Sequence, residues 1–338
     1  MTISAIMNCD MASYERINYL LRPNKSVERK MVCEMLLAIS TIKDLSSYQY
    51  IGFGSTYFAD FSLFHRNLGM SKMVSIEKDD TARDRCEFNK PFSCIELKIG
   101  DSSTILPNLD INTKDSIVWL DYDGPISNII FSDINTVVGM MRPDSFFMLS
   151  LNADFATLKY SMQDEGILEP QTALIDMIGV ERYPNDFRDK KMNQRNYLKV
   201  LYHCLIQEIE SAVRARNGLE EEKVKFHQSI YFDYRDGARM LTLGGFLFYV
   251  DEEDEHLNKM GIRQKNFYRH EDVPYSIQCP ILSMKEIQAL NAHLPCKEMG
   301  KHGNFEDEEL NMFPVDNSEI NQYAALYRYF PNFAETLI

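Results

Sequence analysis

Apolar residues in the first half of the chain fall into short runs of strand length, and these runs alternate with stretches of helical spacing. Parallel strands need crossover connections, which are usually helices, so the alternation predicts a mostly parallel sheet covered by helices on both faces. We therefore expect an α/β, doubly wound fold. The predicted strands are a run that starts at Tyr48 and ends in glycines, followed by residues 72–77, 93–99, 116–121 and 145–151.

A helical pattern precedes the first strand. Apolar residues recur at helical spacing between about residues 27 and 39, and Ser26 is in position to serve as the N-cap. Arg29, Lys30 and Glu34 then lie on the outer face of this helix, where charged residues are expected.

The chain from Thr157 to about Lys225 is predicted to be mostly helical. A stripe of apolar residues between Tyr197 and Val213 has helical spacing, which predicts core packing. Other helices are expected over residues 58–68, 79–89, 129–140, 284–294 and 319–329.

Two strand-like runs, residues 229–234 and 240–250, flank an Asp-Gly pair at Asp236 and Gly237. Asp-Gly between two such runs is a strong signal for a tight hairpin turn. We expect this terminal hairpin to add an antiparallel partner to the edge of the parallel sheet.

The length of 338 residues exceeds the usual limit of about 250–300 residues for one simple core, so insertions or appendages are expected. We divide the chain into an N-terminal helical segment, a Rossmann-like domain with a helical insertion, and a C-terminal extension or lid. These parts cover residues 1–46, 47–250 (with the insertion at about 155–225) and 251–338. The role of the extension as a lid, an oligomer contact or an accessory module is left open.

The net charge of −14 argues against non-specific nucleic-acid binding, because an acidic surface repels the phosphate backbone. The seven cysteines form no CxxC pair or Cys/His cluster, so no metal site is predicted. No apolar run has bilayer-spanning length, and the N-terminus lacks the pattern of a secretory signal. We expect a cytoplasmic protein.

The residues that follow each predicted strand carry the candidate chemistry. In an open parallel sheet, ligands bind beyond the carboxyl ends of the strands. Glycine lets the backbone approach a ligand closely, and a carboxylate accepts hydrogen bonds from ribose hydroxyls or an adenine amine. These strand-end residues are Gly52, Gly54 and Ser55, then Glu77, then Asp101, and finally Asp121, Tyr122, Asp123 and Gly124.

Two other nucleotide sites fit the sequence less well. The dinucleotide fingerprint GxGxxG needs a third glycine, and Tyr57 stands at that position. The GxxxxGK[ST] phosphate loop is absent, and no Tyr-x-x-x-Lys pair follows the fourth or fifth strand as a nicotinamide oxidoreductase would require.

Four motifs together resemble those of class I S-adenosylmethionine (SAM)-dependent methyltransferases. They are Tyr50-Ile-Gly-Phe-Gly-Ser, Val74-Ser-Ile-Glu-Lys-Asp, Ile99-Gly-Asp-Ser and Val118-Trp-Leu-Asp-Tyr-Asp-Gly. The sequence is most similar to a bacterial O-methyltransferase group in which Arg-Pro-x-Lys-x-x-Glu-Arg precedes the glycine loop, as residues 22–29 do here. The resemblance covers about residues 20–152 and the hairpin, which resembles the sixth and seventh strands of that fold.

The resemblance implies SAM as the cofactor and a role for each strand end. Gly52, Gly54 and Ser55 would line the methionine moiety, Glu77 would hold the ribose, Asp101 would contact the adenine, and Asp121 would face the sulfonium. Arg22 or Lys25 would pair with the cofactor's carboxylate, with a surface charge at the helix start as an equal alternative.

The fourth strand end is the predicted reaction centre. Asp121 and Asp123 are the candidate general base or acceptor-orienting pair, and one of them would instead satisfy backbone N–H groups in the turn. Tyr122 would stack on a planar substrate or belong to the core. The sequence Asp-Tyr-Asp-Gly-Pro differs from the Asn/Asp-Pro-Pro-Tyr of amino-methylating DNA enzymes and is distantly similar to the Asp-x-Asp-Pro-x-Gly of tRNA guanine N2-methyltransferases.

The sequence therefore predicts a SAM-dependent methyltransferase with an O or N acceptor, which would be a small molecule, RNA or protein. The alternative is a catalytically silent SAM-fold subunit that binds a nucleotide-like ligand or acts as a scaffold in a complex. A homodimer is compatible with either function. We expect the acceptor pocket to be built from residues 155–225 and the C-terminal third.

Overall fold

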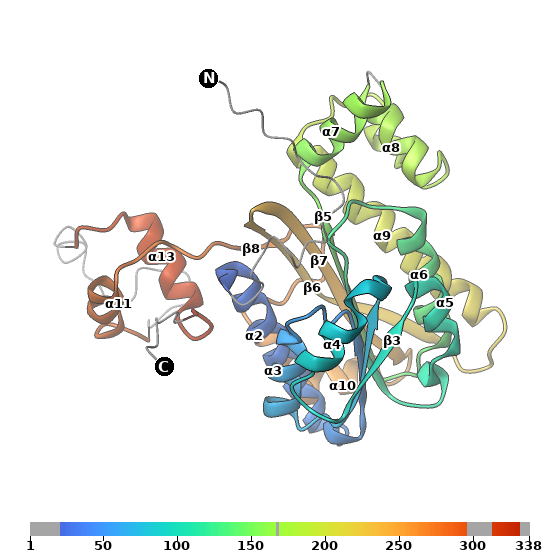
Figure 1. Cartoon of the computed structure of the whole chain (residues 1–338), viewed down its shortest axis with the longest axis horizontal. Helices are drawn as coiled ribbons and strands as arrows, with labels where there is room; N and C mark the ends of the chain where they lie inside the picture. The colour runs from blue at the N-terminus through green and yellow to red at the C-terminus, as the bar shows by residue number, and fades with distance from the viewer. Residues whose placement is uncertain (1–20, 167–168, 296–312, 332–338) are drawn as a thin grey trace.

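A single eight-stranded sheet forms the centre of the protein (Figure 1). The computed structural model describes residues 21–166, 169–295 and 313–331. The strand order is β3-β2-β1-β4-β5-β7-β6-β8. The strands are β1 (Gln49–Gly52), β2 (Lys72–Glu77), β3 (Ile95–Ile99), β4 (Ser116–Asp121), β5 (Ser145–Asn152), β6 (Val224–Asp236), β7 (Ala238–Tyr249) and β8 (Tyr275–Ile277).

The predicted fold class is confirmed. Strands β1 to β5 are parallel, and the β6–β7 hairpin joins them through antiparallel pairing of β7 with β5. The short strand β8, which pairs in parallel with β6, was not predicted, because three residues give no periodic signal.

Helices cover both faces of the sheet (Figure 1). One face carries α5, α6 and α9, with α7 and α8 beyond them, and the other carries α2, α3, α4 and α10. The bounds are α2 (Pro23–Leu37), α3 (Ala59–Leu68), α4 (Arg83–Asn89), α5 (Ser102–Ile105), α6 (Asn128–Met140), α7 (Phe155–Glu165), α8 (Pro170–Ile178), α9 (Gln194–Asn217) and α10 (Glu253–Met260).

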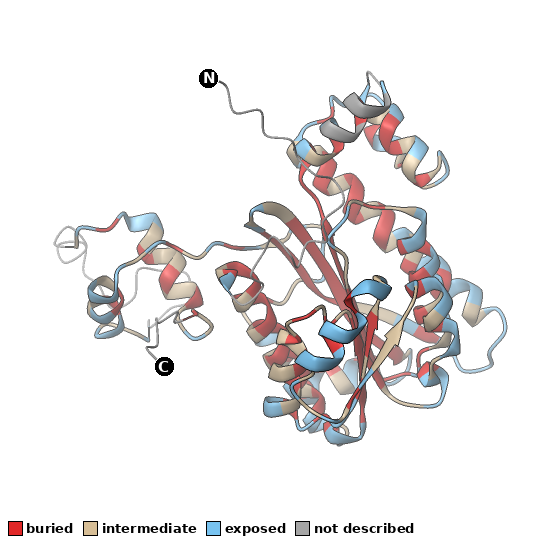
Figure 2. Cartoon of the chain, viewed as in Figure 1, coloured by how far each residue is buried: buried red, intermediate tan, exposed pale blue. Residues whose placement is uncertain are grey.

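Strand β4 shows why the sheet is buried on both sides. Successive side chains point to opposite faces. Val118 and Leu120 enter one core and Ile117 and Trp119 enter the other. The continuous burial of the central strands in Figure 2 follows from this arrangement.

Helix α2 starts earlier than predicted. Its first residue is Pro23, so the N-cap position is occupied by Arg22 and not by Ser26. The Arg22 side chain forms no cap hydrogen bond. Instead the Asp236 carboxylate, in the turn of the β6–β7 hairpin, accepts hydrogen bonds from the backbone N–H groups of Asn24 (3.3 Å) and Lys25 (2.7 Å). A residue distant in sequence therefore satisfies donors that a helix start leaves without intrahelical partners.

The helical region behaves largely as predicted. The apolar stripe of α9 is buried except at Ile206, which is half-buried. Helices α7 and α8 and the start of α9 extend beyond the sheet at the top of Figure 1. None of the helices in the described part of the chain has both the length and the apolar character needed to cross a bilayer.

The described part of the C-terminal region adds α11 (Met284–Asn291) and α13 (Asn317–Leu326), which share a small apolar cluster of their own. This pair lies to one side of the sheet in Figure 1. Tyr329, just after α13, contacts α2: its backbone carbonyl accepts from Lys30 Nζ (2.8 Å) and its hydroxyl donates to Glu34 (2.5 Å).

Gly245 lies on β7 where the backbone of β6 passes closely. A Cβ atom here would come within 2.2 Å of the His227 carbonyl oxygen. We expect Gly245→Ala to force the two strands apart and to lower the free energy of unfolding by about 1–3 kcal/mol. The control is Gly139→Ala, at an exposed helix position where an added Cβ meets nothing within 4 Å. It should raise the free energy of unfolding by up to about 1 kcal/mol. Chemical denaturation measures both, and a Gly245 variant as stable as the wild type would contradict the expectation.

Candidate active site

A cavity of about 630 Å³ opens at the carboxyl ends of β1 to β4. The strand order reverses between β1 and β4, so the cavity lies at the topological switch point of the sheet. Its walls come from the segments that follow β1, β2, β3 and β4, and from α2 and the start of α6. The lining residues are Arg29, residues 53–55, Tyr57, Ala59, Asp60, residues 76–80, residues 100–102, residues 121–125, Ser127, Ile129 and Ile130.

Most of the predicted site residues meet here. Gly54, Ser55, Glu77, Asp101, Asp121, Tyr122 and Asp123 all line the cavity. Gly52, Arg22 and Lys25 are not among the lining residues. No described residue of 155–225 or of the C-terminal third lines this cavity, so the acceptor pocket expected from those residues stays a prediction.

Gly52 is required by packing within the sheet. A Cβ atom there would lie 2.6 Å from the Tyr50 hydroxyl oxygen and 3.1 Å from the Trp119 carbonyl oxygen. The glycine therefore makes room for the Tyr50 side chain. The position of Gly52 in the motif does not indicate this packing role.

The loop after β1 is held in a constrained conformation. Ser55 and Phe58 have φ angles of 50° and 48°, in the left-handed region that non-glycine residues adopt at a cost. The N–H of Gly54 donates to Ser75 Oγ (3.1 Å), which anchors the loop to β2. Ser55 lines the cavity, and its Oγ is buried without a hydrogen-bond partner in the described structure.

Lys25 is buried and anchors Asp121. Its side chain is 1% exposed, so the interpretation of Lys25 as a surface charge is wrong. Its ammonium lies 2.6 Å from Asp121 Oδ1, 2.7 Å from Glu28 Oε2 and 4.5 Å from the centre of the Trp119 ring. Burial alone would raise the pKa of Asp121, but the adjacent Lys25 charge holds this pKa below its usual value.

Arg29 and Asp60 belong to the cavity although the sequence did not identify them as site residues. Arg29 is buried, which corrects its predicted place on the outer face of the helix. The Tyr50 hydroxyl donates to Asp60 Oδ2. Burial raises the pKa of Asp60, although Arg29 and the Tyr50 hydroxyl favour its ionised form. The Arg-Pro-x-Lys-x-x-Glu-Arg motif ends at Arg29 and was the one available signal for it.

Glu77 and Asp101 have different environments at neighbouring strand ends. The backbone N–H of Asp79 donates to Glu77 Oε1 (3.0 Å), while burial raises the pKa of Glu77. Asp101 is half exposed and forms an ion pair with Lys78 (3.1 Å). Glu77 is thus the more rigidly placed of the two carboxylates.

Tyr122 is tied into the protein by its hydroxyl, which donates to the buried Asp133 (2.6 Å). Ser102 donates to the same carboxylate oxygen. The Tyr122 ring meets Phe53 edge-on at 5.2 Å, and burial raises the pKa of its hydroxyl well above the usual value. Tyr122 therefore offers the cavity a fixed ring edge and no free hydroxyl.

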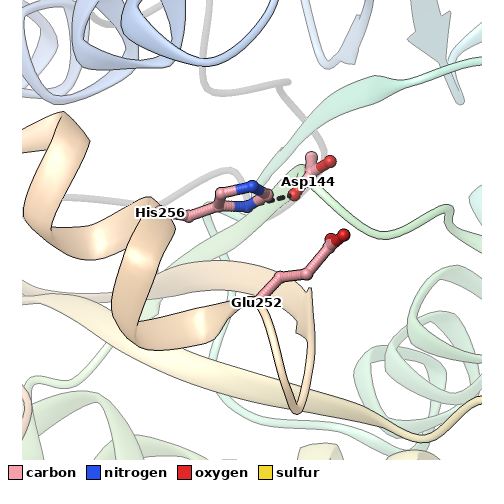
Figure 3. A group of neighbouring side chains, drawn as sticks. All are labelled: Asp144, Glu252 and His256. Atoms are coloured by element: carbon pink, nitrogen blue, oxygen red, sulfur yellow. Dashed lines mark hydrogen bonds and ion pairs between the residues drawn. The ribbon is translucent and has the colours of Figure 1, made fainter.

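A second group of ionisable side chains lies at the opposite, amino edge of the sheet (Figure 3). His256 Nδ1 is 2.9 Å from Asp144 Oδ1, and Glu252 lies beside them. The ammonium of Lys43 is 2.9 Å from the other oxygen of Asp144. Because that positive charge opposes a bound cation, we interpret the group as an ionic link between α10 and the turn before β5.

The sequence is similar to one known protein family along most of its length. A family described as "Putative O-methyltransferase" matches residues 17–338. The chain belongs to this family. Membership places it among the methyltransferases and agrees with the resemblance of its strand-end motifs. No curated protein matches the chain significantly.

Solved structures similar to this methyltransferase are distant from it. The N-methyltransferase NodS from Bradyrhizobium japonicum is 11% identical, with 66% of this chain and 97% of that chain covered and a TM-score of 0.36. An O-methyltransferase from Bacillus cereus, solved in complex with SAH, is 12% identical, with 66% and 81% covered and a TM-score of 0.35. Likenesses of this size support no residue-by-residue comparison.

Proposed function

We propose that the protein transfers a methyl group from SAM to an oxygen or nitrogen acceptor. The observation that carries the proposal is the convergence of Glu77, Asp101 and Asp121, from the ends of three different strands, on one cavity at the switch point of the sheet. Family membership supports the same reaction class.

The residues present fit SAM as the cofactor. Glu77 would accept from the ribose hydroxyls and Asp101 from the adenine amine, between apolar walls that include Ile76 and Ile130. Arg29 replaces Arg22 and Lys25 as our candidate for the cofactor's carboxylate, since it is the cation on the cavity wall near Asp60 and Asp121. Gly54 and Ser55, on the same wall, would receive the methionine end.

SAM supplies an electrophilic methyl group on a positively charged sulfur. The protein's own contribution is to orient the reactants and to provide charge at the right place. Asp121 is suited to face the sulfonium, because Lys25 keeps it ionised and fixed. Asp123 is an exposed residue of the cavity wall, where it would orient the acceptor, and Tyr122 would form part of the wall beside it.

Isothermal titration with SAM and with S-adenosylhomocysteine (SAH) tests the cofactor assignment. We expect both to bind, and SAM incubated with cell extract and the protein should yield SAH. Failure of both ligands to bind would overturn the proposal. Binding without turnover in extract would support the alternative of a catalytically silent subunit.

Bulk properties support a cytoplasmic location and a class of acceptor as part of this proposal. The five cysteines in the described regions are free thiols, which suits the cytoplasm. The net charge of −14 favours a small molecule or a protein as the acceptor over RNA held through its backbone.

A further inference from the structure

The cavity wall holds another half-buried carboxylate, Asp60, which has no role in the reaction proposed above. We propose that Asp60 takes the acceptor's proton, while Asp121 remains the fixed negative charge beside the reacting centre. This inference rests on the proposed function and names the general base of that same site.

The backbone places Asp121 at the end of β4 and Asp60 in the first turn of α3, the helix that follows the neighbouring strand β1. Gly52, the last residue of β1, is paired in register with Trp119 of β4, and Asp121 follows two residues later. The Tyr50 side chain runs past Gly52 toward the carboxyl end of β1, and its hydroxyl binds Asp60. Asp60, in the first turn of α3, therefore faces the same end of the cavity as Asp121.

The surroundings shift the pKa values of Asp60 and Asp121 in opposite directions. Burial and the negative charge of Asp121 raise the pKa of Asp60, against the opposing influence of Arg29 and the Tyr50 hydroxyl. Lys25 lowers the pKa of Asp121 and so weakens it as a base. A general base works best when its pKa lies near the working pH, and an opposed pair of this kind separates the acid–base group from the fixed charge.

Asp60 receives the proton that the acceptor loses during methyl transfer. A lone pair on the acceptor oxygen or nitrogen forms the new bond to the methyl carbon, and the electron pair of the broken carbon–sulfur bond stays on sulfur. The proton leaves the acceptor's O–H or N–H for an oxygen of Asp60. The acceptor is therefore a neutral nucleophile that carries an exchangeable proton.

The ratio of SAM to SAH affinity tests this assignment without a known acceptor. The two ligands differ by the methyl group and its positive charge, so contributions from Glu77, Asp101 and Arg29 largely cancel in the ratio. As the pH rises through the raised pKa of Asp60, its carboxylate gains a negative charge that favours SAM over SAH. Across this titration we expect the wild-type ratio to rise by roughly three- to tenfold.

Variants identify the titrating group. In Asp60→Asn the ratio should no longer vary with pH, whereas Asp121→Asn should lower the ratio and retain the rise. Glu77→Gln should weaken both ligands and leave the ratio unchanged. Tyr50→Phe, which removes a donor to Asp60 while keeping the ring, should move the rise to higher pH.

A wild-type rise that persists in Asp60→Asn, or a wild-type ratio that does not change with pH, would overturn the assignment of Asp60. If Asp60→Asn does not fold, an unshifted rise in Tyr50→Phe would overturn it equally. Failure of the proposed function itself gives a different result, namely that the wild-type protein binds neither SAM nor SAH.

Discussion

Replacing Lys25 with methionine should lower the free energy of unfolding by about 3–5 kcal/mol, because removing one partner of a buried ion pair leaves uncompensated charge in the interior. Methionine keeps much of the apolar volume beside Trp119. It leaves Glu28 and Asp121 without the ammonium that lies within 2.7 Å of both carboxylates. Urea denaturation monitored by the fluorescence of the single tryptophan measures the loss.

The pH dependence separates lost charge compensation from lost packing. In the wild type, Lys25 holds the pKa of Asp121 low, so the pair's stabilisation is present at neutral pH and is lost only as the pH falls through that low value. In the variant the effect of burial on Asp121 is no longer offset by Lys25, so a proton can neutralise its carboxyl at higher pH and the deficit should shrink as the pH falls.

Lys98→Met is the control, because Lys98 and its partner Glu96 are both exposed. It should change the free energy of unfolding by less than about 1 kcal/mol. A Lys25 variant no less stable than this control would contradict the buried ion-pair network.

Replacing Glu77 with glutamine should weaken the binding of both SAM and SAH by about ten- to a hundredfold, the range that lost hydrogen bonds to a charged group would produce. The effect is equal for the two ligands because they share the ribose. Burial raises the pKa of Glu77, so wild-type affinity for both ligands should fall as the pH drops through that raised value. The variant should lack this fall.

Glu96→Gln, on the neighbouring strand β3 and outside the cavity wall, is the matched control and should bind both ligands as the wild type does. Wild-type affinity in Glu77→Gln would remove Glu77 from the proposed ribose site. Titration calorimetry across the same pH range supplies both measurements.

The strand-end residues were predictable because they depend on local sequence and one topological rule. Strands β1 to β4 are short runs rich in apolar residues, and the end of each is marked by glycine or a carboxylate. Parallel strands bring these ends to one edge of the sheet, so Glu77, Asp101 and Asp121 reach the same cavity without knowledge of the loops.

Arg29 and Asp60 were not predictable in this way. Their places depend on the path of the Tyr50 side chain and on how α2 packs across the sheet, and neither leaves a periodic trace in the sequence. The burial of Lys25 likewise depends on Trp119 and Tyr234, which come from strands far along the chain.

The position of the acceptor pocket has no local marker in the sequence and stays a prediction. Residues 155–225 carry no strand-end motif, and our prediction from the sequence is that they and the C-terminal third form this pocket. In the structure, their apolar stripe on α9 packs into the core. The described cavity is instead lined by residues between Arg29 and Ile130.

The contact of Asp236 with the start of α2 has a consequence for any attempt to divide this protein. A fragment that stops after β5 would contain every residue on the cavity wall, yet it would lack the hairpin that holds Asn24 and Lys25 in place. The binding site is thus encoded in two stretches about two hundred residues apart, and both must be transplanted together for a chimera to retain it.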